Sequence, residues 1–201
     1  MREKLYSTVR TQSSSFTPLL LLAVFSFGVL EGQVEQRTIL SFEPDAVSDW
    51  FVVNDGVMGG VSSSRIRPAS DDAAIFEGHL SLENNGGFAS VRARINQGAL
   101  SKASTVVLRV RGDGKRYQLR LRMGRNWDGV SYAVSFETTA DTWTTVEIPL
   151  RQFQPIFRGF VPRNARALSP SRVEQIGLMV TDKQEGPFRL EISMLDAIIE
   201  P

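Results

Sequence analysis

The chain contains no cysteine among its 201 residues. That absence excludes disulfide bonds, thiolate nucleophiles and cysteine-bound metal sites. His79 is the only histidine, so a metal site built from several histidines is excluded as well. The sequence also lacks an Asn-X-Ser/Thr glycosylation motif and a nucleophile elbow that would support a catalytic triad. We therefore expect no metal ion and no cofactor.

Neither sign of charge is in clear excess, because 23 lysines and arginines accompany 22 aspartates and glutamates. The first 32 residues account for the net charge of +1, since Arg2, Lys4 and Arg10 outnumber Glu3 and Glu31 there. The rest of the chain is therefore neutral overall. A strongly basic domain is the usual mark of nucleic-acid binding, so we expect no nucleic-acid partner.

The N-terminal segment has the pattern of a targeting sequence. Basic residues near the start precede an apolar run, residues 19–30, that is interrupted only by Ser26 and Gly28. This run is shorter than the roughly 20 residues that span a bilayer, so it predicts a signal peptide over residues 1–32. The predicted location is exported or periplasmic, with membrane contact only through this segment if it is uncleaved. A mitochondrial presequence is the alternative, because residues 1–17 are rich in Ser, Thr and Arg and contain a single acid.

Beyond this segment the sequence is dominated by period-two alternation of apolar and polar residues between turn signals. Helix signals are few, and Ser169-Pro170-Ser171 predicts one short turn. We therefore predict an all-β fold, a single β-sandwich domain over residues 33–201 with one or two short helical turns. Residues 150–168 have no regular period, and such a long irregular segment in a compact domain is usually functional or mobile.

The alternating runs define the expected strands and core. The predicted strands are residues 38–42, 50–53, 61–67, 73–82, 88–95, 105–111, 117–123, 130–136, 144–148, 175–181 and 188–199. The predicted core residues are Trp50, Phe76, Leu108, Leu119, Phe136 and Phe188.

Two of these runs, residues 105–111 and 117–123, flank a Gly-Asp-Gly turn and predict a β-hairpin. Alternation places four arginines on its outward face: Arg109, Arg111, Arg120 and Arg122. Like charges on one sheet face are destabilising unless something compensates them. One interpretation is a solvated face, on which outward acids such as Glu147 and Glu191 pair with the arginines. The other is a basic docking surface for an acidic partner or ligand.

Two glycine-rich stretches, residues 54–62 and 80–91, lie between β-prone runs. The first lacks the Lys-Ser/Thr pair of a phosphate-binding loop, and a strand rather than a helix follows it. Both stretches therefore predict shaped connections that use the conformational freedom of glycine. Functional side chains often lie on such loops because a rigid scaffold positions them.

Two other functions stay open at this point. Asp55 and Glu83 lie beside the glycine-rich loops and supply the two carboxylates that a sugar-active enzyme needs. Trp127 and Trp143 lie near predicted strand ends and supply aromatic surfaces of the kind found in carbohydrate-binding sites. Core packing or an edge role is the simpler explanation of either tryptophan.

Five segments resemble the complex I intermediate-associated protein family. They are NDGVMGGVS (54–62), LSLENNGGFASV (80–91), LRVRGDG (108–114), FRG (157–159) and IGLMVTDKQEGPFRLEI (176–192). The resemblance implies a galactose-binding-like jelly-roll β-sandwich. It also implies a non-enzymatic assembly factor, or chaperone, that assists the assembly of respiratory NADH:ubiquinone oxidoreductase or a related membrane complex.

We therefore expect a protein partner, with subunits of a respiratory membrane complex as candidates, and no catalysis. The expected binding surface comprises the loops 54–62 and 84–88, the segment 150–168 and the outward arginines. Its candidate residues are Asn54, Asp55, Met58, Asn84, Asn85, Arg109, Arg111, Arg120, Arg122 and Arg158. An exported carbohydrate-binding, lectin-like module is the alternative, and a carboxylate-dependent sugar-active enzyme is a second alternative.

Overall fold

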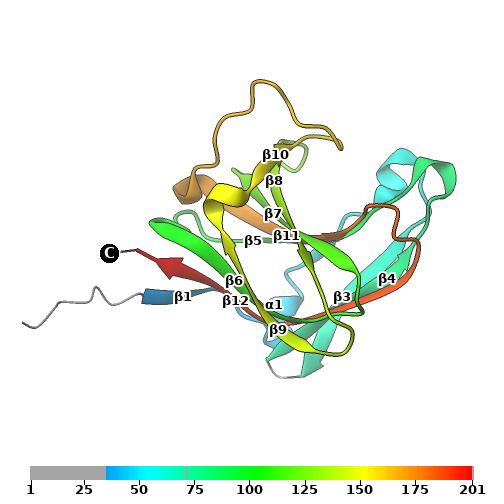
Figure 1. The fold of residues 1–201 in the computed structure, drawn as a ribbon, viewed down its shortest axis with the longest axis horizontal. Helices are drawn as coiled ribbons and strands as arrows, with labels where there is room; N and C mark the ends of the chain where they lie inside the picture. The colour runs from blue at the N-terminus through cyan, green and yellow to red at the C-terminus, as the bar shows by residue number, and fades with distance from the viewer. Residues whose placement is uncertain (1–34, 71, 201) are drawn as a thin grey trace, which may run out of the picture. The chain divides into compact units, whose positions relative to one another are not determined.

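The computed structural model describes residues 35–70 and 72–200, and twelve β-strands in this part of the chain form two antiparallel sheets (Figure 1). The sheets enclose a common apolar core, which confirms the predicted all-β sandwich. The targeting segment predicted over residues 1–32 lies outside the described residues. Among the described helices, none is long and apolar enough to span a membrane.

The first sheet contains six strands in the order β3-β4-β12-β6-β9, with β1 paired to the C-terminal half of β12. β12 is 14 residues long and forms the centre of this sheet, because β4 pairs with its N-terminal half and β6 pairs along its other side. The strands are β1 (Glu35–Leu40), β3 (Ser63–Ser70), β4 (Ala73–Leu80), β6 (Ala103–Arg111), β9 (Trp143–Pro149) and β12 (Gly186–Ile199).

The second sheet also contains six strands, in the order β10-β8-β7-β11-β5-β2. β11 lies near its centre and pairs with β7 on one side and with β5 on the other. The strands are β2 (Phe51–Val52), β5 (Ala89–Arg94), β7 (Arg116–Met123), β8 (Ser131–Glu137), β10 (Gln154–Ile156) and β11 (Val173–Val180). The predicted strands all overlap observed ones, whereas β10 lies in the segment that has no sequence period.

Short helical turns occupy several connections. They are α1 (Pro44–Val47) and four 3₁₀ turns, η1 (Asp55–Met58), η2 (Glu83–Asn85), η3 (Leu150–Gln152) and η4 (Pro170–Arg172). η4 is the turn predicted at Ser169-Pro170-Ser171, although the Ser169 side chain makes no capping hydrogen bond. α1 also begins with a proline, Pro44, and has Asp45 in its first turn, although this start signal was not selected from the sequence.

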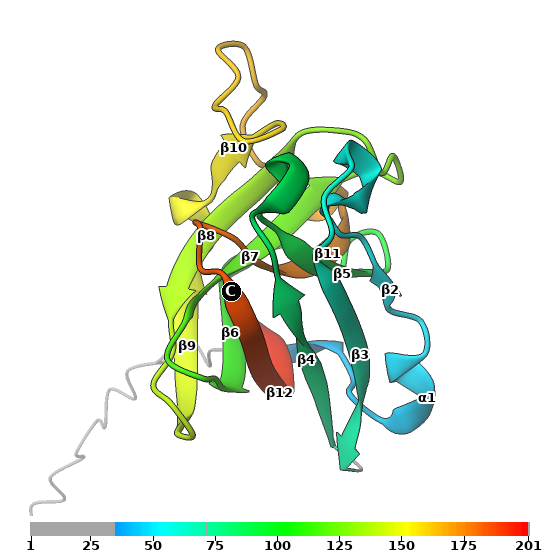
Figure 2. The ribbon, with the colours of Figure 1, turned by 90° about the vertical axis from the view of Figure 1, so that its right-hand side faces the viewer.

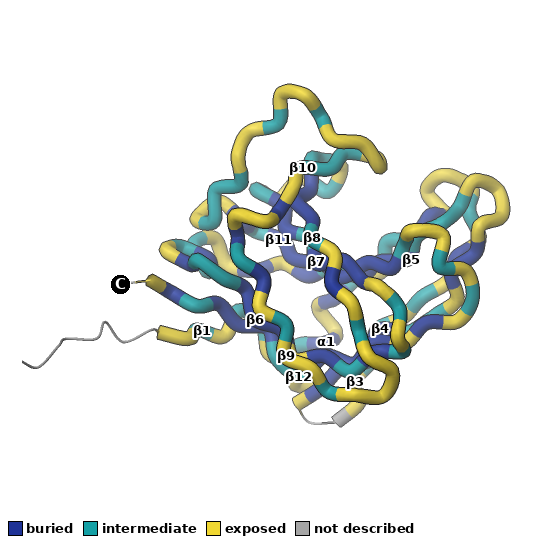
Figure 3. Tube along the Cα trace, viewed as in Figure 1, coloured by how far each residue is buried: buried dark blue, intermediate teal, exposed yellow. Residues whose placement is uncertain are grey.

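Alternation places apolar side chains between the sheets and polar ones on the outer faces. In the second sheet, Leu119, Leu178 and Val91 lie opposite one another on three neighbouring strands, and all three are fully buried. Burial of one such side chain contributes roughly 1.5–3 kcal/mol to folding. All six predicted core residues are buried, and Figure 3 shows buried stretches along strands such as β7 and β11, whereas β1 and many of the connections are exposed.

The predicted hairpin between residues 105–111 and 117–123 is wrong. The two strands, β6 and β7, lie in different sheets, since β6 pairs with β9 and β12 whereas β7 pairs with β8 and β11. The connection therefore crosses from one sheet to the other. Asp113 shapes the crossing by accepting hydrogen bonds from the N–H of Lys115 (3.1 Å) and from the N–H of Arg189 on β12 (2.9 Å).

Candidate functional site

The two glycine-rich stretches meet at one buried carboxylate. Asp55 is the first residue of η1 and is fully buried. Its Oδ1 accepts a hydrogen bond from the N–H of Ser62 (3.0 Å), and its Oδ2 accepts the Ser62 hydroxyl (2.5 Å) and the N–H groups of Gly87 (2.7 Å) and Phe88 (3.3 Å). One side chain thus ties the first glycine-rich loop to the second, and Figures 1 and 2 show their turns side by side. We call this arrangement the Asp55 clamp.

The Asp55 clamp lies where the chain passes between the sheets. The β2–β3 connection leaves the second sheet for the first, and the β4–β5 connection returns. Asn54 strengthens the same junction, because its Oδ1 accepts the hydroxyl of Ser64 (2.8 Å) and the N–H of Ser90 (3.2 Å). Its Nδ2 donates to the backbone oxygen of Ser62 (3.4 Å). Asn54 and Asp55 therefore hold the loops rather than face solvent.

The electrostatics of Asp55 fit this structural role. Burial by itself would raise the pKa of the carboxyl group, but the hydrogen bonds from Ser62, Gly87 and Phe88 outweigh it and hold the pKa below its usual value. Asp55 is therefore ionised at neutral pH. A general acid needs a raised pKa, and the acceptor oxygens are already occupied, so this side chain does not support a catalytic pair with the exposed Glu83.

Glycines make room for the clamp. A Cβ atom at Gly60 would lie 2.4 Å from the Asp55 Cγ, and one at Gly86 would lie 2.7 Å from the Asp55 Oδ2. Gly59 ends η1 with a φ of 93°, in the left-handed region that favours glycine. Gly59, Gly60 and Gly86 thus serve the close approach and turning of the backbone, which explains them without a phosphate-binding role.

The clamped loops expose apolar side chains. Val57 is 76% exposed, Met58 58% and Val61 52%, and Leu82 of the second loop is also exposed. Hydrogen bonds between Ser62 and Ser81 hold the two loops together beside Val61 and Leu82. We call these four residues the apolar loop tip. Among the predicted candidates, only Met58 belongs to it.

Asn84 and Asn85 lie beside the apolar loop tip in η2 and are exposed. Both adopt positive φ angles, 53° and 61°. Asparagine tolerates this conformation better than most residues. The backbone conformation of the turn therefore explains why asparagines occur at these two positions. Contact with a partner would be a second role.

Two of the predicted arginines belong to the first sheet. Arg109 and Arg111 lie on β6 with their guanidinium groups over the Trp143 ring, at 4.7 and 5.2 Å from its centroid. Arg111 forms a salt bridge with Glu191 (2.6 Å), and Arg109 donates to the hydroxyl of Ser193 (3.3 Å). Glu191 is one of the acids expected to compensate these arginines, so the solvated-face interpretation describes Arg111. Within the described residues Arg109 forms no salt bridge, and neither does Glu147, the other expected acid.

Arg120 and Arg122 lie on the outer face of the second sheet, apart from Arg109 and Arg111. They are accompanied by Arg92 on β5, and within the described ranges none of these three forms a salt bridge. The four arginines expected to share one face are therefore two separate pairs, because the chain crosses between the sheets after Arg111.

The last candidate, Arg158, lies in the turn that follows β10. It forms an exposed salt bridge with Asp128 (3.3 Å) and lies over the Phe157 ring at 5.3 Å. An exposed pair of this kind contributes little to stability. Sequence reasoning did not select Arg92 or Ser62 as site residues, although alternation does place Arg92 on an outward face.

Solved structures similar to this chain share its fold. The family 11 carbohydrate-binding module of the cellulosomal cellulase Lic26A-Cel5E of Clostridium thermocellum has a TM-score of 0.65 and 16% identity, over 84% of this chain and 96% of that chain. A second structure, the Clostridium thermocellum module in complex with a β-1,3-1,4-mixed-linked tetrasaccharide, has a TM-score of 0.62 and 16% identity, over 83% of this chain and 97% of that one. At this identity the likeness shows the fold alone, and it supports the predicted galactose-binding-like jelly roll.

Sequence relatives identify the family. "Complex I intermediate-associated protein 30, mitochondrial" of Mus musculus is 28% identical over 189 residues, which cover 83% of this chain and 57% of that protein. The Drosophila melanogaster protein of the same description is 24% identical over 190 residues, which cover 83% of this chain and 64% of that protein. The chain therefore spans less than two thirds of the length of these relatives. The family model for Complex I intermediate-associated protein 30 matches residues 40–192, and the chain belongs to this family.

Proposed function

We propose that the protein is a non-enzymatic binding module that assists the assembly of a respiratory NADH:ubiquinone oxidoreductase, or of a related membrane complex, through contacts with its protein subunits. The observation that carries the proposal is the apolar loop tip, formed by Val57, Met58, Val61 and Leu82. Membership of the family supports the class of partner. The apolar loop tip supplies a surface suited to binding a protein subunit.

The tip has two properties of a protein-binding surface. Its four exposed apolar side chains lie on two loops that the Ser62–Ser81 hydrogen bonds join, and apolar groups gathered on a surface mark interaction sites more often than single ones do. The Asp55 clamp also fixes the loops before a partner arrives. A preorganised surface loses less conformational entropy on binding than a mobile one.

We further propose a mitochondrial location, because both curated relatives are described as mitochondrial. The exported location expected from residues 1–32 is the competing outcome. Sequencing the N-terminus of the mature protein from fractionated native cells tests the two locations together. A mature chain recovered outside the cell or in a periplasm would overturn the mitochondrial proposal.

The partner proposal predicts a defect when charge is placed on the tip. We expect the double variant Val57→Asp/Met58→Asp to recover respiratory-complex subunits at least tenfold less efficiently than wild type, since burial of a charge at an interface centre is unfavourable. Affinity capture from native cells, followed by quantitative mass spectrometry, measures the change. Both residues are exposed, so the free energy of unfolding should change by only about 0.5 kcal/mol.

A matched control adds the same two charges elsewhere. Thr144 and Thr145 are exposed on β9 in the first sheet, and Thr144→Asp/Thr145→Asp should capture subunits as wild type does. Equal capture by both double variants would exclude the tip as the binding surface. Capture of no respiratory subunit by wild type, together with glycan binding that Trp127→Ala abolishes, would instead favour the carbohydrate-binding alternative.

A further inference from the structure

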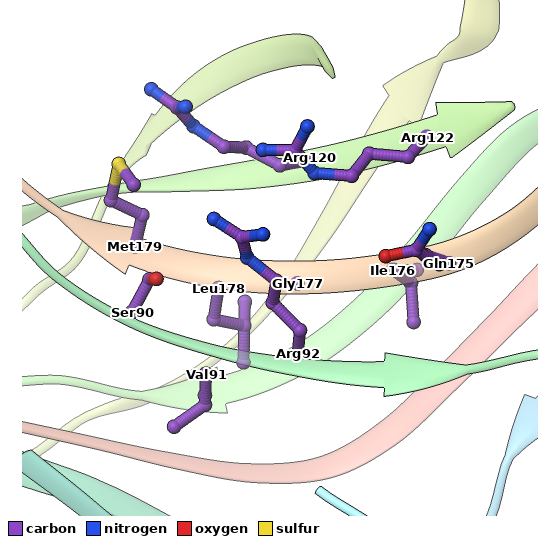
Figure 4. Close-up of a pocket in the computed structure, with 10 residues that line it drawn as sticks. All are labelled: Ser90, Val91, Arg92, Arg120, Arg122, Gln175, Ile176, Gly177, Leu178 and Met179. Atoms are coloured by element: carbon purple, nitrogen blue, oxygen red, sulfur yellow. The ribbon is translucent and has the colours of Figure 1, made fainter. Parts of the chain in front are cut away.

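The outer face of the second sheet carries three arginines around one glycine. Arg120 on β7 and Arg92 on β5 lie directly opposite Gly177 on β11, and Arg122 lies opposite Gln175 on the same strand. Figure 4 shows the three arginine side chains on one side of the sheet, about the strand that carries Gly177. We call Arg92, Arg120 and Arg122 the arginine cluster.

Gly177 has no side chain, and β5 with the stem of Arg92 packs closely against it. A Cβ atom there would lie 2.8 Å from the backbone oxygen of Val91 and 3.2 Å from the Arg92 Cγ. Adjacent strands are about 4.8 Å apart, so the Cα atoms of Arg92 and Arg120 are separated by roughly 10 Å. The residues around Gly177 line a hollow of about 10 Å³, which is room for about one water-sized group.

Within the described residues, the arginine cluster donates only to neutral acceptors. Arg92 and Arg122 each donate to one backbone carbonyl oxygen, at 3.2 and 2.5 Å. Arg120 donates to the side chains of Gln118 (2.8 and 3.1 Å) and Ser131 (3.4 Å). A guanidinium group carries five N–H donors. Most donors of the cluster therefore have no partner in this part of the chain.

The carboxylates that act on the cluster from a distance are engaged elsewhere. Asp128 pairs with Arg158 (3.3 Å), and Asp182 pairs with Arg116 (3.2 Å). The first sheet differs, because its Glu77 alone forms salt bridges with three arginines. The chain thus compensates arginines with acids on one sheet and leaves the cluster on the other sheet without them.

Without a bound anion, the arginine cluster destabilises the folded protein. Burial, together with repulsion from neighbouring arginines, lowers the pKa of Arg120 and of Arg122 to about 10, so both are still cations at neutral pH. Burying a charge without a counter-charge is unfavourable. A bound anion would relieve the repulsion and use the free donors.

We propose that the arginine cluster binds a carboxylate of an acidic segment on a protein partner. Guanidinium groups bind carboxylates through paired hydrogen bonds. The hollow is too small to enclose a bulky ligand. The ligand must therefore reach the guanidinium groups from outside with a small planar end, such as an aspartate or glutamate carboxylate, rather than with a phosphorylated sugar. The inference rests on the proposed function for the class of partner, but its residues are separate from the apolar loop tip.

Binding of a fluorescein-labelled hexaglutamate peptide to the purified full chain tests the proposal. We expect the double variant Arg92→Gln/Arg120→Gln to bind at least tenfold more weakly in fluorescence anisotropy at 50 mM NaCl. Arg65→Gln/Arg67→Gln removes two exposed charges from the first sheet, where Glu77 keeps Arg189 as a partner. This control should bind within about twofold of wild type, and a hexaglutamine peptide should not bind.

The cluster variants should also fold well. Relief of repulsion should leave the melting temperature of Arg92→Gln/Arg120→Gln unchanged or higher, and Arg120→Met provides a second variant that keeps the aliphatic stem. An equal loss of binding in the cluster and control variants would overturn the proposal, because it would indicate general attraction. Cluster-dependent binding of tripolyphosphate without binding of hexaglutamate would overturn it too, since the site would then take phosphate.

Capture from native cells separates this inference from the proposed function. Wild type that captures no respiratory subunit, yet binds hexaglutamate through the cluster, would overturn the proposed function and support the anion site. Normal capture by Arg92→Gln/Arg120→Gln, with unchanged peptide binding, would overturn the anion site and leave the proposed function in place.

Discussion

Replacing Asp55 by asparagine should lower the free energy of unfolding by about 3 kcal/mol, because a neutral amide cannot satisfy the donors that surround this carboxylate. Asparagine keeps the size of the side chain but exchanges one acceptor oxygen for a donor NH₂ group. In either orientation, that NH₂ faces the N–H of Ser62 or the N–H groups of Gly87 and Phe88. Urea unfolding followed by tryptophan fluorescence, to which the buried Trp50 contributes, measures the loss.

An exposed aspartate provides the control for this change. Asp49 is exposed just after α1, and Asp49→Asn should alter the free energy of unfolding by no more than about 0.5 kcal/mol. If Asp55→Asn were no more costly than Asp49→Asn, the buried carboxylate would not be holding the two loops together.

Lowering the pH should reduce the difference in free energy of unfolding between wild type and Asp55→Asn. The pKa of Asp55 is lower in the folded protein than its ordinary value of 3.8, which applies to the unfolded chain. The carboxylate therefore contributes its full stabilisation above the unfolded pKa and loses it as the pH falls through the folded pKa. Unfolding measured from pH 8 to pH 5 should show a constant difference, which should narrow as the pH decreases further below about 4.

The strands could be predicted from the sequence because each has one buried face. Alternation between Leu119, Arg120 and Leu121 is a local property, and it survives whichever strands become neighbours. Pairing is not local. A Gly-Asp-Gly turn connects residues 105–111 and 117–123 in the same way for a hairpin and for a crossing between sheets. The crossing is determined by pairing of β6 with β12 and of β7 with β11, from the far end of the chain.

The candidate site was predictable to the same limited extent. The sequence places Asp55 beside glycines, but its role depends on the N–H groups of Gly87 and Phe88, more than 30 residues away. Likewise, alternation places Arg92 and Arg120 on outward faces. Only the insertion of β11 between their strands brings them together around Gly177. The residue types and the face on which each side chain lies follow from the sequence, whereas the spatial neighbours of each side chain follow from the topology.

Three glycines of the first loop should differ widely in their tolerance of alanine. Gly60→Ala should cost about 2–4 kcal/mol, because its Cβ would lie 2.4 Å from the Asp55 Cγ and would displace the clamp. Gly59→Ala should cost about 1–2 kcal/mol, since Gly59 has open space around it but a φ of 93°. Gly56→Ala should be neutral or stabilising by up to about 1 kcal/mol, because Gly56 has neither a close neighbour nor a positive φ.

Urea unfolding of the three alanine variants gives this order directly, and Gly56→Ala serves as the matched control within the same loop. The order separates two explanations of the glycine-rich stretch. If glycine were required only for loop flexibility, the three substitutions would have similar effects. If close packing against Asp55 is the main constraint, Gly60→Ala costs the most, and its cost falls in an Asp55→Gly background, where the obstructing side chain is gone. A Gly60→Ala cost that is unchanged in that background would show that the glycine and the carboxylate are not coupled.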